Sequence, residues 1–272
     1  MSIVSTPKVF VGYDSREDIA WQVCRHSILR HSNDDVIVVP IRQTVLRELN
    51  LYSRPHDQGA STEFSLTRFL TPYLAGQSGW VLFCDCDFLF TSDVREVFEG
   101  LDPSKAVYCV QHDYVPAHQV KMDGKLQAAY PRKNWSSFML FNCDHPDVRA
   151  LTPAVVNSAP PAFLHRFGWV SDDSAIGALD ADWNFLAGEY PKPDALPRVI
   201  HFTNGGPWFE HWQDCDFGDL WLAELEHYLH SVAQDDLGRL PEPRRVALLA
   251  EQRAHTIEDE AEAPLRRLSA AS

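Results

Sequence analysis

Two aspartates and one histidine have the residue types and positions to hold a metal ion. Asp85 and Asp87 directly follow the apolar run 80–84, and His201 lies in a second apolar run at 199–202. Side chains alternate across a strand, so two aspartates one residue apart point to the same side. Two carboxylates that converge in a cleft repel each other unless a cation or a raised pKa relieves them. Together with His201 they offer two oxygens and one nitrogen, a set that suits Mn²⁺ or Mg²⁺.

Each of these residues also has a structural alternative. The aspartates could cap loops or a helix that starts near Thr91, and a histidine in a strand is more often a hydrogen-bonded core residue than a ligand. We favour the metal site because the apolar residues 88–90 follow the pair. Unpaired carboxylates are costly in such surroundings.

A glycine pair, Gly205 and Gly206, follows His201 and precedes Pro207 and Trp208. Residues without a side chain let backbone N–H groups approach a phosphate closely. We therefore expect a phosphate group to bind beside the metal ligands.

Alternating apolar runs and amphipathic segments must position these residues. We expect strands at 8–12, 35–41, 80–84, 106–111, 137–142 and 199–202, and helices at 16–30, 64–74, 146–156, 221–232 and 244–253. The continuously apolar, β-branched run 35–41 is typical of a strand covered on both faces. This order predicts an α/β fold with a parallel sheet, in which ligands bind beyond the carboxyl ends of the strands. We expect a main domain at 1–232 and a C-terminal helical extension and tail at 233–272.

Composition excludes several classes of function. The chain has 272 residues and a formal charge of −14, which disfavours nucleic-acid binding. No apolar run approaches the ~20 residues that cross a bilayer, and residues 1–6 do not begin a secretory signal, so we expect a cytoplasmic protein. Six cysteines without CxxC spacing indicate reduced, mostly buried thiols.

An ordered set of motifs resembles the GT-A-fold glycosyltransferases, most of all family 8, which contains glycogenin and bacterial galactosyltransferases of lipopolysaccharide synthesis. The motifs are Asp85-x-Asp87 at a strand end, Arg68 on the helix before it, and His201-Phe202 followed by glycine and Pro207-Trp208. The resemblance covers residues 8–212 and implies the GT-A fold, a Rossmann-like, mostly parallel sheet. It also implies metal-dependent transfer of a sugar from a nucleotide-diphosphate sugar, with UDP expected, to a saccharide or other hydroxyl acceptor, with retention of configuration.

The resemblance assigns roles to individual residues. Asp85, Asp87 and His201 are its metal ligands. Its donor-binding residues are Gly12, Tyr13, Asp14, Arg68, Asp85, Asn142, Gly205 and Gly206, with Tyr13 stacking on the base. Asp172 and Asp173 match an acidic pair near the reacting carbon, where one of them orients the donor sugar hydroxyls or stabilises the ring cation rather than acting as nucleophile; if the reaction inverts, one of them becomes the general base. Trp183-Asn184 matches an aromatic-Asn element that follows.

The sequence departs from the family where a lysine normally precedes Pro-Trp and neutralises the leaving diphosphate. Gly206 takes that place, and the segment is one residue shorter. Candidates to replace the lysine are Lys121, Lys125, Arg132 and Lys133, for which a solvated loop face is the alternative. Of Trp135, Trp169, Trp183, Trp208 and Trp212, we expect about two to touch a sugar and the rest to pack in the core.

Three other functions stay open. A sugar nucleotidyltransferase normally has a glycine-rich first loop, whereas this one has only Gly12. A metal-dependent hydrolase normally clusters more ligands. A non-catalytic nucleotide-sugar or carbohydrate-binding protein on the same fold would explain the missing lysine.

Overall fold

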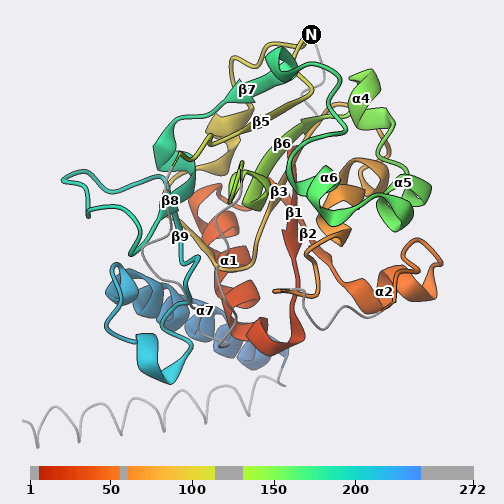
Figure 1. Ribbon diagram of the computed structural model, residues 1–272. Helices are drawn as coiled ribbons and strands as arrows, with labels where there is room; N and C mark the ends of the chain where they lie inside the picture. Colours follow the sequence, from red (N-terminus) through yellow and green to blue (C-terminus); the bar gives the residue numbers. More distant parts are fainter. Residues whose placement is uncertain (1–5, 56–60, 114–130, 240–272) are drawn as a thin grey trace, which may run out of the picture. The chain divides into compact units, whose positions relative to one another are not determined.

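The computed structural model describes residues 6–55, 61–113 and 131–239 (Figure 1). Packing divides the chain into two compact units, residues 1–224 and 225–272. The candidate site lies in the first unit. The expected functional boundary after residue 232 stays a prediction, and the helix expected at 244–253 lies outside the described residues.

Among the described residues, six strands form the main sheet in the order β2-β1-β3-β6-β5-β7. Their bounds are β1 (Lys8–Gly12), β2 (Ile37–Ile41), β3 (Trp80–Cys84), β5 (Val107–Cys109), β6 (Phe138–Asn142) and β7 (Ile176–Ala178). β1 runs parallel to β2 and β3, and β7 runs parallel to β5. β6 runs antiparallel to both β3 and β5. The expected α/β fold with a mostly parallel sheet is confirmed, with β6 reversed.

A small second sheet joins β4 (Phe88–Phe90), β9 (Val199–His201) and β8 (Phe185–Leu186) in the order β4-β9-β8. β4 runs antiparallel to β9, with Phe88 opposite His201. β8 runs parallel to β9, with Leu186 opposite His201. The sequence predicted β9 but neither β4 nor β8, because two or three apolar residues are too few to show a period.

Helices lie on both sides of the main sheet. Their bounds are α1 (Asp18–His31), α2 (Gln43–Glu48), α3 (Thr71–Leu74), α4 (Pro146–Arg149), α5 (Pro153–Ser158), α6 (Pro161–His165) and α7 (Gly218–Arg239). Figure 1 shows α1 on one side of the sheet and α4, α5 and α6 on the other. No helix in the described part of the chain combines the length and apolar character that a membrane crossing requires.

Prolines divide two of the expected helices. The segment 64–74 contains a 3-10 turn, η2 (Thr67–Leu70), followed by α3 with Pro72 in its first turn. The segment 146–156 contains α4 and the start of α5, because Pro153 begins a new helix that the Thr152 side chain caps. The segment 16–30 forms α1 only from Asp18 onward. It begins with another 3-10 turn, η1 (Ser15–Glu17), which Asp14 caps.

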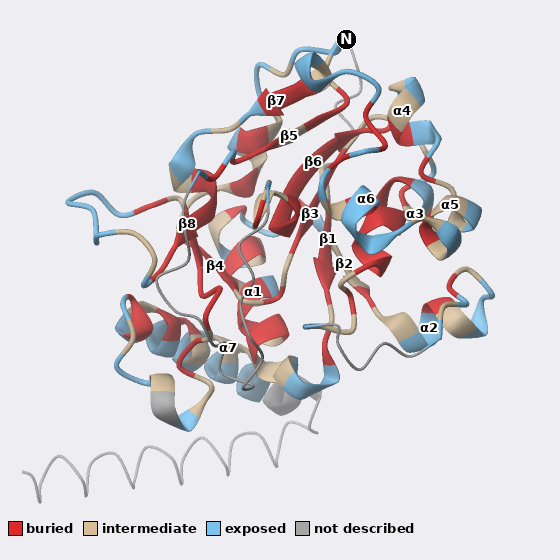
Figure 2. Ribbon diagram, in the orientation of Figure 1, coloured by how far each residue is buried: buried red, intermediate tan, exposed pale blue. Residues whose placement is uncertain are grey.

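The expectation that β2 is covered on both faces is wrong. β2 is the edge strand of the main sheet, and Ile37 is 46% exposed. Pro40 lies within it, at a position where an edge strand tolerates a residue without an N–H. The buried centre of the sheet is β1, β3 and β6 (Figure 2). All six cysteines are free thiols and five are buried, as expected.

Candidate functional site

The metal ligands predicted from the sequence come together because backbone hydrogen bonds join the two sheets beside them. The Asp85 amide donates to the Ser137 carbonyl over 3.0 Å, which extends the pairing of β3 with β6 by one residue. The carbonyl of Asp87 accepts from the Phe202 amide over 2.9 Å, beside the pairing of β4 with β9. The end of β3 and the end of β9 are therefore fixed next to each other.

Asp85, Asp87 and His201 each offer one ligand atom, and these atoms lie within 4.8 Å of one another. Nε2 of His201 is 3.4 Å from Oδ2 of Asp87. The histidine is 2% exposed, and its ring stacks on Phe88 with 4.2 Å between ring centroids. The predicted cluster is thus present, and its imidazole is held in one orientation.

The hydrogen bonds behind His201 determine which ring nitrogen carries the proton. The Ser137 hydroxyl donates to the Asn134 carbonyl over 2.7 Å, so it accepts from Nδ2 of Asn184, 3.0 Å away. This leaves the amide oxygen of Asn184 facing Nδ1 of His201 at 2.9 Å. An oxygen acceptor requires a proton on Nδ1.

This protonation pattern fits a divalent cation. In the neutral ring, Nε2 presents its lone pair on the side of Asp87, where a carboxylate repels it unless a cation lies between them. A histidine that hydrogen-bonds through its second nitrogen is the usual arrangement in metal sites. Two carboxylates and one imidazole suit Mn²⁺ or Mg²⁺.

Arg68 lies directly behind the first aspartate. Its Nη1 is 2.8 Å from Oδ1 of Asp85 and also donates to the Ser136 carbonyl over 2.8 Å, while Nε donates to the Ser65 carbonyl over 3.0 Å. The arginine is only 5% exposed. It therefore positions Asp85 from within the protein.

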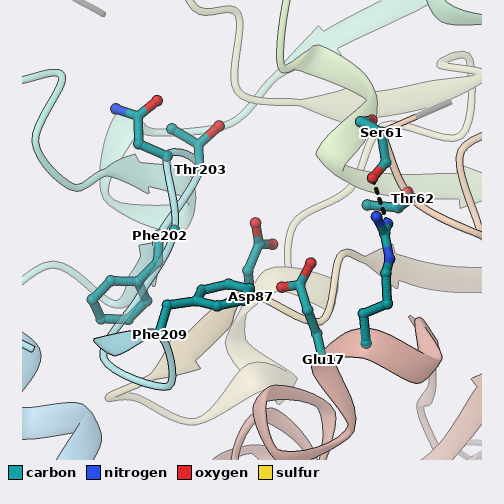
Figure 3. A pocket seen from close by; sticks show the side chains of 10 residues that line it. Glu17, Ser61, Thr62, Asp87, Phe202, Thr203 and Phe209 are labelled. Atoms are coloured by element: carbon teal, nitrogen blue, oxygen red, sulfur yellow. Dashed lines mark hydrogen bonds between the residues drawn. The ribbon is translucent and has the colours of Figure 1, made fainter. Parts of the chain in front are cut away.

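A cavity of about 180 Å³ opens beside the cluster. Ten of the residues that the structure describes line it: Arg16, Glu17, Ser61, Thr62, Asp87, Phe202, Thr203, Asn204, Gly205 and Phe209. Figure 3 shows Ser61 and Thr62 on one wall and Phe202, Thr203 and Phe209 on the other, with the carboxylates of Asp87 and Glu17 between them. The cavity is thus continuous with Asp87 of the cluster and with the loop after His201.

Arg16, Glu17, Ser61 and Thr62 were not predicted. The signal for the first two was their place directly after the first strand, where α/β folds bind ligands. No sequence signal places Ser61 and Thr62 opposite the loop after His201.

Gly12 and Tyr13, in the loop after the first strand, both have contacts within the protein. A Cβ atom on Gly12 would lie 2.4 Å from the ring of Phe64, so this glycine makes room for the phenylalanine. The Tyr13 hydroxyl donates to Asp18 over 2.8 Å, which raises the pKa of Tyr13 together with partial burial. The guanidinium of Arg42 covers a face of the Tyr13 ring at 3.7 Å. Base stacking by Tyr13 stays a prediction.

Asp14 is fully buried and organises this loop. It accepts from the Arg16 amide and Nε over 2.9 Å each, and from the Glu63 amide over 3.1 Å. Burial by itself raises the pKa of Asp14, but the hydrogen bonds from Arg16 and Glu63 outweigh it and hold the pKa below its usual value. The carboxylate therefore stays charged at neutral pH and links the loop to residue 63.

The two glycines after His201 have different surroundings. Gly205 lines the cavity and has a φ of +121°, a conformation that side chains disfavour. A Cβ on Gly206 would lie 2.0 Å from the indole ring of Trp208, so this glycine accommodates the tryptophan. Only Gly205 has the position expected of a phosphate-binding residue.

The structure does not bring Asn142 to the cluster. Asn142 pairs with Trp80 at the start of β3, whereas Asp85 follows the end of β3. Its side chain donates to the carbonyls of Pro103 and Lys105 and accepts from the Asp144 amide. The expected sugar-site role is replaced by a structural one, because β6 runs antiparallel to β3.

Asp172 and Asp173 are likewise not brought to the cluster. They directly precede β7, which has the same direction as β3, so they lie at the opposite end of the main sheet from Asp85. Asp172 is exposed and caps the turn η5 (Asp173–Ala175), and its pKa is lowered by the hydrogen bond from the Ser174 amide. Asp173 forms an ion pair of 2.6 Å with Arg132.

Of the four residues expected to replace the family's lysine, the structure describes two. Arg132 binds Asp173 and the Arg166 carbonyl. Lys133 is buried, with 7% exposure. Lys121 and Lys125 lie outside the described residues.

The tryptophans pack against protein. Trp169 and Trp183 are buried, and Trp135 donates to the His112 carbonyl. None of the five named in the sequence analysis is among the ten residues that line the cavity.

Comparison with solved structures identifies the fold. The chain superposes on the bifunctional glycosyltransferase WbbM with a TM-score of 0.54 and 15% identity, over 83% of this chain and 50% of that one. For the glycosyltransferase GlyE of Streptococcus pneumoniae the TM-score is 0.53 and the identity 14%, over 85% and 64% of the two chains. For the galactosyltransferase LgtC in complex with donor and acceptor sugar analogs the TM-score is 0.51 and the identity 12%, over 88% of this chain and 99% of that one.

This chain therefore spans half of WbbM, less than two thirds of GlyE and nearly all of LgtC. At these identities the likeness establishes the fold, which is the GT-A fold expected from the sequence. The closer relation to family 8 stays a prediction.

No family model matches the sequence. A curated protein, Protein CDI of Arabidopsis thaliana, is 50% identical over 225 residues, which span 81% of this chain and 86% of that protein. Identity at this level over most of both chains establishes common descent. The chain therefore belongs to the family of Protein CDI.

Proposed function

We propose that this protein is a metal-dependent glycosyltransferase. It transfers a sugar from a nucleotide-diphosphate sugar, with UDP as the expected nucleotide, to a saccharide or other hydroxyl acceptor. The observation that carries the proposal is the Asp85, Asp87 and His201 cluster, whose ligand atoms lie within 4.8 Å of one another beside a cavity. The cluster lies at the carboxyl end of β3, where α/β folds bind their ligands.

Asp85, Asp87 and His201 would hold a divalent cation, for which Mn²⁺ is the first candidate and Mg²⁺ the second. When bound, such a cation supplies Lewis-acid stabilisation of a leaving diphosphate. Arg68 holds the carboxylate of Asp85, and Asn184 keeps the proton of His201 on Nδ1. The ligands therefore keep their orientation before a donor binds, which limits the reorganisation that binding requires.

Retention of configuration is proposed from the resemblance to family 8. The resemblance implies that the acceptor attacks from the face that the diphosphate leaves and that the diphosphate takes the acceptor's proton. Asp172 and Asp173 lie at the other end of the main sheet, so neither receives a role in breaking or forming the glycosidic bond. NMR of the anomeric proton of the product tests the stereochemistry, and an inverted product would overturn retention.

Incubation with Mn²⁺ and a panel of nucleotide sugars, followed by detection of the released nucleotide, tests the transferase itself. We expect release from at least one donor, and loss of that release with EDTA or in Asp87→Asn. The matched control is Asp34→Asn, because Asp34 is exposed and lies at the end of α1. No release from any donor, with an unchanged melting temperature on addition of UDP and Mn²⁺, contradicts the proposal.

A non-catalytic binding protein is the alternative, because Gly206 stands where family 8 has its lysine. The same experiment separates the two functions. A melting temperature raised by UDP and Mn²⁺ without nucleotide release would favour binding alone.

A further inference from the structure

We propose that Arg16 supplies the positive charge that contacts the diphosphate of the donor, in place of the lysine that the loop after His201 lacks. This inference rests on the proposed function and assigns one binding residue within it. The departing diphosphate takes up the negative charge that develops in glycosyl transfer, so a cationic side chain at that place has a large effect on rate and affinity.

The first argument is position. Within the described part of the chain, Arg16 is the one basic residue that lines the cavity, where it shares the lining with Asp87 and with residues 203–205 of the loop after His201. The charged residues beside it, Glu17 and Asp87, are both acidic. A diphosphate entering this cavity meets Arg16 as its protein cation, in addition to the metal held by the cluster.

The second argument is that Arg16 is held in place. Its Nε and Nη2 bind the two carboxylate oxygens of Asp14 over 2.9 and 2.7 Å, and Nη2 also donates to the Ser61 carbonyl over 2.8 Å. The Asp14 side chain is 0% exposed, whereas that of Arg16 is 50% exposed. The carboxylate of Asp14 is therefore buried, while part of the Arg16 side chain is exposed at the surface of the cavity.

Two other arginines considered for this role, Arg68 and Arg132, are engaged elsewhere. Arg68 is 5% exposed and pairs with Asp85. Arg132 pairs with Asp173, which precedes β7 at the opposite end of the main sheet. A guanidinium also suits the task, because it stays charged and carries five N–H donors, more than the bonds of Arg16 to Asp14 and Ser61 use.

The chain contains a matched control for Arg16. Asp93 caps the turn η3 (Val94–Phe98) and binds Arg95 with the same spacing and geometry, through the Arg95 amide at 2.9 Å and Nη2 at 2.6 Å. Arg95 does not line the cavity; its second partner is Asp35, at 3.1 Å. Loss of either arginine removes an ion pair with a capping aspartate, but of the two only Arg16 lines the cavity.

The test is calorimetric titration with Mn²⁺-pyrophosphate, a probe without base or sugar, on the full-length protein and on Arg16→Gln and Arg95→Gln. We expect Arg16→Gln to bind it at least about tenfold more weakly, the loss expected for a charge-assisted hydrogen bond. We expect Arg95→Gln to bind it as the unmodified protein does. The affinity for Mn²⁺ alone should be the same in all three, which a general distortion of the site would not allow.

Equal pyrophosphate affinity in the three proteins overturns this inference, while nucleotide release from a sugar donor would leave the proposed function standing. If the unmodified protein binds neither Mn²⁺-pyrophosphate nor UDP, both are overturned. If Arg16→Gln does not fold, the decisive measurement is the Nε–H NMR resonance of Arg16 in the unmodified protein, assigned by its absence from Arg16→Lys. We expect Mg²⁺-pyrophosphate to shift it, and an unmoved resonance overturns the inference.

Discussion

The amide oxygen of Asn184 lies 2.9 Å from Nδ1 of His201, and this contact decides which nitrogen of the buried imidazole faces Asp87. Asn184 ends the turn η6 (Ala181–Asn184), directly before β8, and β8 pairs with the strand that contains His201. The asparagine and the histidine are therefore fixed to each other by backbone as well as by side chain.

Asn184→Ala should weaken Mn²⁺ binding by about 10–100-fold, because His201 loses the acceptor that keeps its proton on Nδ1. Titration of Mn²⁺ followed by electron paramagnetic resonance measures the affinity. Asn157→Ala is the control, since Asn157 binds the carbonyls of Leu51 and Pro153 instead. An unchanged affinity in Asn184→Ala would mean that the imidazole does not ligate the ion.

Mn²⁺ should stabilise the unmodified protein, because a ligand that binds only the folded state adds about 2.7 kcal/mol at 100 times its Kd. Asp87→Asn removes one of the two carboxylates and should abolish most of this increase. Thermal unfolding with and without Mn²⁺ measures it, with EDTA to reverse the effect. The control Asp34→Asn should retain the full increase, and a similar loss in both variants would argue against the cluster.

Gly12→Ala should destabilise the protein by about 1–3 kcal/mol, the range for overpacking a filled core. The added methyl group would lie 2.4 Å from the Phe64 ring, which itself lies below the guanidinium of Arg68. Urea unfolding measures the loss. The double variant Gly12→Ala with Phe64→Leu should recover part of it, and absence of any recovery would indicate that Gly12 matters for another reason.

Glu224→Gln tests a buried ion pair outside the cluster. The Glu224 side chain is 3% exposed and binds His26 and Arg30 of α1. Burial by itself raises the pKa of Glu224, but the hydrogen bonds from Arg30 and His26 outweigh it and lower the pKa from its usual 4.5. At pH 7 we expect the variant to be less stable by about 1–3 kcal/mol in urea unfolding.

The pH dependence of that difference follows from the direction of the shift. With a depressed pKa in the folded state, the unfolded chain takes up its proton first as the pH falls. The stability from this carboxylate is therefore complete above the unfolded value of 4.5 and is lost as the pH falls through the lower folded value. The difference in free energy of unfolding between the unmodified protein and Glu224→Gln should narrow below pH 4.5. Glu226 is exposed, so Glu226→Gln is the control. Its free energy of unfolding should match that of the unmodified protein.

The strand-end aspartates and His201 could be predicted because their signals are local: an apolar run, an alternation of faces, and a position at the end of the run. Because one residue separates Asp85 from Asp87, the alternation of side chains along a strand predicts both carboxylates on one side. What the sequence does not contain is the order and direction of strands. The error over Asn142 follows from this, because a strand reversed between β3 and β5 carries its last residue to the other end of the sheet.

The same missing information on strand order explains the wrong expectation for β2 and the cavity residues that the sequence did not predict. A run of β-branched residues predicts a strand but not whether it lies in the centre or at the edge, and β2 lies at the edge. Arg16 and Glu17 were missed because their importance depends on residues 203–205 facing them across the cavity. That pairing is a tertiary contact between distant segments, which no local pattern encodes.

The placement of Asp85 and Asp87 after β3 and of His201 on β9 also sets an order of events during synthesis. A ribosome-bound chain that has emerged only as far as β8 has both carboxylates but neither the imidazole nor the strand that pairs with β4. Such a nascent chain has two of the three proposed ligands. On the proposed function, the complete metal site therefore forms only after translation has passed His201.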